Sequence, residues 1–431
     1  MSLTVELQAL VNNGKERYED AIVCDAIKQY VGHVGAVPDF AWGEMPWSAK
    51  WKADWHTAVE SRITEAGTMR DTLGTTGGNL IQVAADYSHS DIEAKLDFDI
   101  SAENSALTPF LLGTKKAGDS VSGHPGGHAG PPAYFPGGNY GVNIPDDNPD
   151  GKRLNYLWKD GQLNHIPAEM GPPGFKHSFT DIVEALETPG HRDLTNFVNE
   201  HYETLTKAEN MVEQYGGGLT QRPSTDFIDD VVNAYPGIIK NRADLLYIAK
   251  NNYDEMRKEM ALETDTLKLY WASESASQAY FVHANNILRY FDGVGGEMKW
   301  LADEGKKAAD TIDKLMLAYA KVGFEKIGQL IDQIKAVSDA ANSLTGSVDD
   351  PVKALTATLN LMVTQMLADW KAANEAAQSM LSITETAISG QPDLGTSEHG
   401  AIPFPQDGSG GQWTNGGQWK PGQRNVPVPT A

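Results

Sequence analysis

The clearest hydrophobic pattern lies between Trp47 and Asp91, where apolar residues recur at steps of three, four and seven. Its members are Trp51, Trp55, Ala58, Met69, Leu73, Leu80, Val83 and Tyr87, with Ile63 taking over where the stripe slips near Arg62. This period predicts one long helix with a single buried stripe. Charged residues fall between the stripe positions and predict a solvated opposite face. They are Lys52, Asp54, Glu60, Arg62, Glu65, Arg70 and Asp71.

A second helical pattern precedes this one, over residues 4–31. The connection between the two, residues 34–48, contains the Gly, Pro and Asp that are typical of a turn. Because an amphipathic helix must cover its stripe, the two segments predict an antiparallel helical hairpin. Trp42 and Trp47 are expected to pack its turn.

Helical periodicity stops after the hairpin and returns only near Ser178. Residues 105–176 are dense in Gly and Pro, which excludes a helix there. Alternating apolar residues around Asp160-Gly161 predict a small β-hairpin within this insert. The tail from residue 391 is rich in Gly, Pro and Gln, which predicts disorder, and its repeated Gly-Gly-Gln-Trp could be a docking peptide.

The region 177–390 has the patterns of several helices. Breaks are expected at Pro189-Gly190, at Gly216–Gly218 and at Pro236-Gly237, and a kink or loop at residues 292–296. Asp350-Pro351 is expected to start a last helix that Gly390 ends. The prediction is a mainly α protein, an elongated helical hairpin or bundle. Its regions are 1–104, the hairpin; 105–176, the insert; 177–390, a helical bundle; and 391–431, the tail.

The composition of the chain argues against nucleic acid and membranes as its partners. A net charge of −23, from 35 basic and 58 acidic residues, repels nucleic acid and anionic lipid surfaces. No apolar run is long enough to span a bilayer, so membrane insertion is not expected. The N-terminus does not have the pattern of a signal peptide, so export would need a route that is independent of one. The single cysteine, Cys24, is expected to be a packed residue rather than a reactive thiol.

A tryptophan turn, Trp47-Ser48-Ala49, is followed forty residues later by a closing Tyr87-x-x-x-Asp91. With these two motifs the hairpin resembles the WXG/ESX family of type VII secretion substrates. The four-residue spacing places phenol and carboxylate on one helix face. The family has Gly where this chain has Ala49, so either the turn differs or Trp42-Gly43 forms the tight bend.

The resemblance implies that the secretion ATPase reads Tyr87 and Asp91. It implies a protein that is cytoplasmic before export and then secreted or on the cell surface. Family members pair hairpin on hairpin, so a WXG-like partner, self-association, or later helices of this chain are expected to cover the stripe. Trp271-Ala272-Ser273 resembles a second, degenerate turn, although no Tyr-x-x-x-Asp closes it.

Candidate chemistry is sparse. Asp146, Asn148 and Asp150 copy the first half of a calcium loop, but Leu157 stands where the bidentate Glu is required, which excludes a regular EF-hand site and leaves an irregular calcium site as the alternative. The histidines are scattered, and no nucleophile, phosphate-binding or zinc motif is present. We therefore expect a non-enzymatic protein without cofactors, acting through protein–protein contacts. The alternatives are a secreted toxin or enzyme with its activity in the insert or later helices, and an intracellular helical scaffold.

Overall fold

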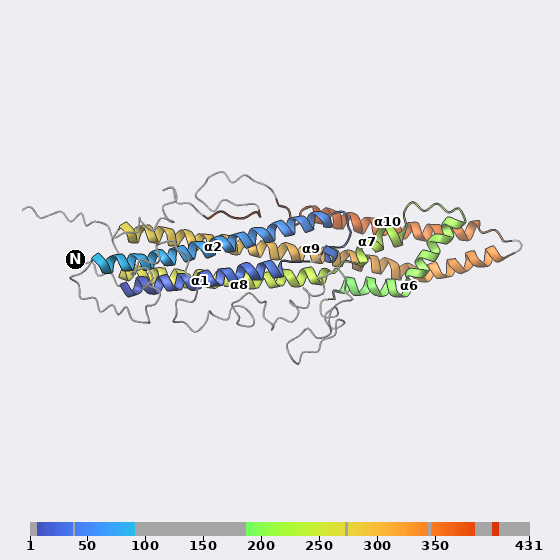
Figure 1. Cartoon of the computed structure of the whole chain (residues 1–431). Helices are drawn as coiled ribbons and strands as arrows, with labels where there is room; N and C mark the ends of the chain where they lie inside the picture. Colours follow the sequence, from blue (N-terminus) through green and yellow to red (C-terminus); the bar gives the residue numbers. More distant parts are fainter. Residues whose placement is uncertain are drawn as a thin grey trace, which may run out of the picture.

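The computed structural model describes residues 7–37, 39–90, 187–271, 275–343, 346–383 and 399–404, and these residues form an elongated helical bundle (Figure 1). The helices are α1 (Leu7–Val34), η1 (Asp39–Trp42), α2 (Ser48–Ser90), α6 (Pro189–Gln214), η4 (Ser224–Ile228), α7 (Asp229–Val232), α8 (Pro236–Tyr270), α9 (Ser275–Asn342) and α10 (Asp349–Gln378). The prediction of a mainly α fold is confirmed.

The first hairpin consists of α1 and α2, which run antiparallel. Near the bend, the Trp55 indole donates to the Gly35 carbonyl at 2.6 Å, and further along Arg70 pairs with Asp25 at 2.9 Å. Close to the open end, Gly77 lies so near α1 that a Cβ on it would come within 2.6 Å of the Gly14 carbonyl oxygen. The predicted hairpin, with one long second helix, is therefore confirmed.

A second antiparallel hairpin is formed by α8 and the first half of α9. Pro236 and Gly237, where the sequence predicts a break, are the first two residues of α8, because proline suits the first helical position. Tyr253 packs against Phe291, and Arg257 pairs with Asp292 at 2.5 Å. Trp271 directly follows α8, so this hairpin also has a tryptophan at its bend.

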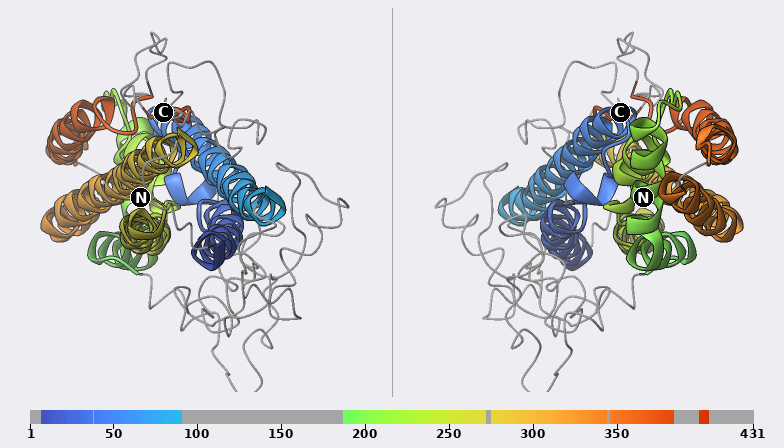
Figure 2. Two further views of the ribbon diagram at one scale, coloured as in Figure 1. Left: turned by 90° about the vertical axis from the view of Figure 1, so that its left-hand side faces the viewer. Right: turned by 90° about the vertical axis from the view of Figure 1, so that its right-hand side faces the viewer.

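The two hairpins pack against each other head to tail. The amide of Tyr235, just before α8, donates to the Ala41 carbonyl in the bend of the first hairpin. At the other end, the Tyr280 hydroxyl donates to Asn13 of α1 at 2.7 Å. End-on views show α1 and α2 beside α8 and α9 (Figure 2), and the four helices share one apolar core.

Beyond these four helices, α9 continues and is covered by α6 and α10. Phe197 of α6 meets Phe324 of α9 with ring centroids 5.3 Å apart. Where α10 ends, Glu304 of α9 accepts a hydrogen bond from the Leu381 amide at 3.0 Å.

Several expectations need correction or lie outside the described residues. The kink or loop expected at residues 292–296 is wrong, because α9 continues through them with Val294 and Met298 in the core. Helix α10 begins at Asp349, so Asp350 lies in its first turn rather than at its N-cap, and it ends at Gln378, before Gly390. The β-hairpin near Asp160-Gly161 lies outside the described residues, none of which forms a strand.

Candidate functional site

The bend of the first hairpin is made by Gly43 rather than by Ala49. Gly43 has φ +72°, a backbone conformation that glycine adopts without strain. Ser48 opens α2 and its hydroxyl donates to the carbonyls of Gly43 and Met45 at 2.9 and 2.7 Å. Ala49 lies exposed in the first turn of α2, so the helix needs no glycine there.

Tryptophans fill this bend. Trp42 contacts Trp51 and Trp55, with ring centroids 6.3 and 5.8 Å apart, while Trp47 packs on Trp370 of α10 at 5.5 Å. The Trp51 indole donates to the Ala377 carbonyl at 3.2 Å. These buried rings fix the hairpin to α10, so the role the structure gives them is packing.

The predicted signal residue Tyr87 lies at the opposite end of the first hairpin from this bend, in the last turn of α2. Its side chain is half-buried, and its hydroxyl accepts a hydrogen bond from the Trp271 indole at 3.4 Å. Asp91, the other predicted signal residue, lies outside the described residues. We call the region around Tyr87, Trp271, Tyr280 and Phe281 the tip.

Trp271 is the residue that organises the tip. It is fully buried, and its ring centroid lies 5.8 Å from Tyr280 and 6.2 Å from Phe281 at the start of α9. Ala272 and Ser273, the rest of the suggested second turn, lie outside the described residues. The structure therefore brings the tryptophan of the second bend against the tyrosine that ends the first hairpin.

Apolar side chains are also exposed around the tip. Leu262 and Leu269 of α8 are 71% and 79% exposed, and Val282 of α9 is 51% exposed. An open groove lies between α1 and α8, lined by Gln8, Asn12, Leu262, Glu263 and Tyr270, among others. Leu262 lines this groove as well as being exposed, so the groove presents apolar surface to a partner.

A buried ionic seam lies between α2 and α9. Arg62 of α2 is fully buried and holds Glu65 through two hydrogen bonds of 2.6 and 2.9 Å, while its third nitrogen reaches Glu297 of α9 at 3.1 Å. Burial raises the pKa of Glu65 to about 7, against the opposing influence of Arg62 and of the Ile402 amide.

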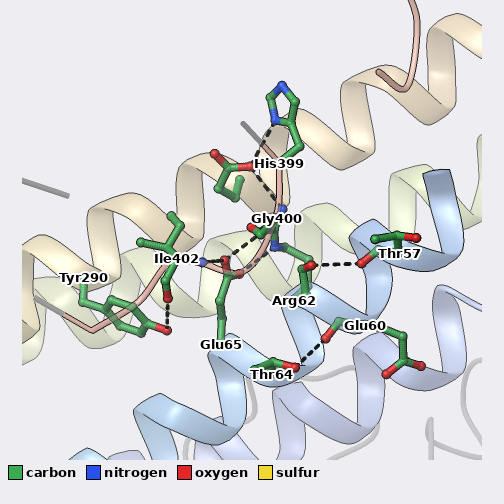
Figure 3. A network of polar contacts seen from close by, with 11 residues as sticks. Thr57, Glu60, Arg62, Thr64, Glu65, Tyr290, His399, Gly400 and Ile402 are labelled. Atoms are coloured by element: carbon green, nitrogen blue, oxygen red, sulfur yellow. Dashed lines mark hydrogen bonds and ion pairs between the residues drawn. The ribbon is translucent and has the colours of Figure 1, made fainter. Parts of the chain in front are cut away.

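The sequence-based prediction of a solvated charged face is thus wrong at Arg62 and Glu65. The tail prediction also needs correction, because residues 399–404 lie across this seam (Figure 3). The available signal was the slip of the apolar stripe at Arg62, which marks the place where α2 turns a polar position inward.

In the described part of the chain, the side chains indicate neither a metal site nor a reactive thiol. None of its His, Cys, Asp and Glu side chains gather in groups of three that could hold a metal ion. Asp146, Asn148 and Asp150, the weak calcium candidate, lie outside the described residues. Cys24 is buried, as expected, and burial raises the pKa of its thiol well above the ordinary value.

Comparisons with known proteins give this chain no relative. No protein-family model matches it, and no curated protein or solved structure matches it either. Among the described helices, none combines the length and the apolar character needed to cross a membrane.

Proposed function

We propose that this protein is a non-enzymatic, type VII (ESX-like) secreted helical protein, exported through its Tyr87-x-x-x-Asp91 segment and acting through protein–protein contacts. It is cytoplasmic before export and secreted or on the cell surface afterwards. The observation that carries the proposal is the head-to-tail arrangement of the two hairpins, which places Trp271 against Tyr87.

The arrangement supports the proposal because it supplies, within one chain, the pairing of hairpins that the resemblance implies. The apolar stripe of α2 is buried at Trp55, Met69 and Leu80. The second hairpin covers part of this stripe, because Gly305 of α9 lies directly against Trp55. A Cβ on Gly305 would come within 2.6 Å of the Trp55 ring. A separate partner subunit is therefore not required to cover these residues.

The surface of the tip supports binding to a protein partner, which we propose to be the type VII secretion ATPase. Tyr87 is held by Trp271 but only half-buried, so part of its ring remains accessible. Leu262, Leu269 and Val282 add exposed apolar surface nearby, and such residues contribute to protein interfaces when they are buried on binding.

An export assay tests the proposal. The chain is produced in cells that have a type VII system, and its amounts in the medium and in the cells are compared for wild type, Tyr87→Ala and Asp91→Ala. We expect the wild type in the medium and at least a tenfold loss of export for each variant.

Tyr215→Ala is the matched control, because Tyr215 is also half-buried at the end of a helix, α6, away from the tip. It is expected to be exported like the wild type. Wild-type export of Tyr87→Ala and Asp91→Ala would overturn the signal assignment. A wild type that stays in the cells would favour an intracellular scaffold.

A further inference from the structure

Residues His399–Phe404 cross the seam between α2 and α9 as an irregular segment whose backbone is held by side chains of both helices (Figure 3). Arg62 of α2 donates to the Gly400 carbonyl, and Glu65 accepts from the Ile402 amide at 2.9 Å. From the other side, Tyr290 of α9 donates to the Ile402 carbonyl at 3.1 Å. Because these contacts are made to peptide groups, they recognise the backbone at residues 400 and 402 rather than one particular side chain.

Two apolar side chains give the segment its selectivity. Ile402 is 7% exposed and joins the core, and Phe404 packs on Tyr290 with ring centroids 5.3 Å apart. At the start of the segment, His399 stacks on Trp300 at 3.5 Å. The spacing of the two apolar anchors defines the pattern Ile-x-Phe at residues 402–404, whereas Gly400 contributes its carbonyl and a Cβ there would meet nothing within 4 Å.

We propose that the seam is a peptide-binding site for an Ile-x-Phe segment, which this chain's own residues 400–404 occupy as an exchangeable ligand. The partner is a peptide of the same pattern, which takes the place of the bound segment. This site is separate from the tip and does not depend on the export function.

Exchange is expected because the bundle is held together without the segment. Arg62 and Glu297 join α2 to α9 directly, and the hairpins also meet elsewhere along their length. His399 has φ +70°, a conformation that costs a residue other than glycine of order 1 kcal/mol, so the bound form carries strain. The hydrogen bonds to Gly400 and Ile402 can be made equally to another peptide backbone.

The test uses the full chain with its own segment weakened. Ile402→Asp places a charge in the apolar position and releases the segment from the seam. A fluorescent synthetic peptide with the sequence of residues 397–406 is titrated with wild type and with Ile402→Asp, and binding is followed by anisotropy at equilibrium. We expect the peptide to bind the variant at least tenfold more tightly than the wild type, whose site is occupied.

Further variants locate the site. In the Ile402→Asp background, Tyr290→Phe removes the hydroxyl that donates to the peptide and should weaken binding about threefold to tenfold, whereas Tyr319→Phe, a buried tyrosine of α9 away from the seam, should not. Equal affinity for wild type and variant, or no binding to an Ile402→Asp chain with wild-type circular dichroism, would overturn the proposal. If Ile402→Asp does not fold, Phe404→Ala serves as the weakened chain under the same criteria.

Discussion

Trp271 donates its indole N–H to the hydroxyl of Tyr87 across 3.4 Å, and this contact joins the bend of the second hairpin to the end of the first. The two residues are 184 positions apart in the sequence. Tyr87 therefore takes its position from both hairpins, and a change in the second hairpin should alter the presentation of the proposed signal.

Replacing Trp271 tests this dependence. Trp271→Phe keeps an aromatic ring but removes the N–H and leaves space beside Tyr280, so we expect a loss of about 1–3 kcal/mol in the free energy of unfolding. Urea denaturation measures it. Trp370→Phe, at a half-buried tryptophan of α10, is the matched control and should lose less. Equal losses of unfolding free energy would show that Trp271 at the tip stabilises the fold no more than the half-buried Trp370 does.

The close approach of α1 and α2 at Gly14 and Gly77 makes a sharp test of the first hairpin. In Gly77→Ala the new methyl would lie 2.6 Å from the Gly14 carbonyl oxygen, so the helices must separate and about 1–3 kcal/mol of stability should be lost. A Cβ added to Gly74, one turn earlier in α2, would meet nothing within 4 Å. Gly74→Ala should therefore stabilise by up to about 1 kcal/mol through helix propensity. Thermal unfolding of both variants measures whether the two changes in stability have opposite signs. A Gly77→Ala variant as stable as the wild type would contradict the close approach of α1 and α2 at this position.

The position of the bend is tested by exchanging glycine and alanine. Gly43→Ala is expected to destabilise by about 1–3 kcal/mol, because φ +72° strains alanine and the new methyl would lie 2.9 Å from the Met45 sulfur. Ala49→Gly places glycine where the family resemblance expects it, yet should cost about 0.5–1 kcal/mol because residue 49 is helical. Chemical denaturation measures both. Stabilisation by Ala49→Gly would mean that the bend lies there.

The buried carboxyl of Glu65 predicts a pH dependence of stability. Its pKa is raised from 4.5 to about 7, so the folded protein binds this proton more tightly than the unfolded chain. The resulting stabilisation is fully present below pH 4.5 and is lost as the pH rises through 7, amounting to at most about 3 kcal/mol.

Glu65→Gln should remove this contribution while keeping an acceptor for the Ile402 amide. The measurement is the free energy of unfolding from pH 4.5 to 7.5 for both proteins, with the variant expected to show the smaller decrease. Burial also raises the pKa of Asp20 to about 6. Asp20 is present in both proteins, so its contribution to the pH dependence cancels in the comparison. Parallel curves would mean that Glu65 ionises normally in the folded chain.

The features that the sequence predicts correctly are local ones. The stripe of α2, the tryptophan-filled bend and the break before the long helix α8 each follow from neighbouring residues. The path of α9 through residues 292–296 was missed because Phe291, Val294 and Met298 are buried by partners distant in sequence, and their packing outweighs the low helix propensity of glycine.

The seam could not be predicted for a similar reason. The Gly400 carbonyl that Arg62 meets lies 338 positions further along the chain, so the slip of the apolar stripe at Arg62 can mark a polar position that turns inward but not the segment that it binds. At the tip, the sequence does suggest both Tyr87 and Trp271, as a signal and as a second turn. Their contact depends on how two hairpins pack, which periodicity does not determine.

The most direct measurement of the central claim is the equilibrium affinity of the purified full-length chain for the type VII secretion ATPase, compared between wild type and Tyr87→Ala. If the tip is the export address, the wild type binds and the variant binds at least tenfold more weakly, a difference of about 1.4 kcal/mol. Equal affinities for two folded proteins, or no binding by the wild type, would contradict the account.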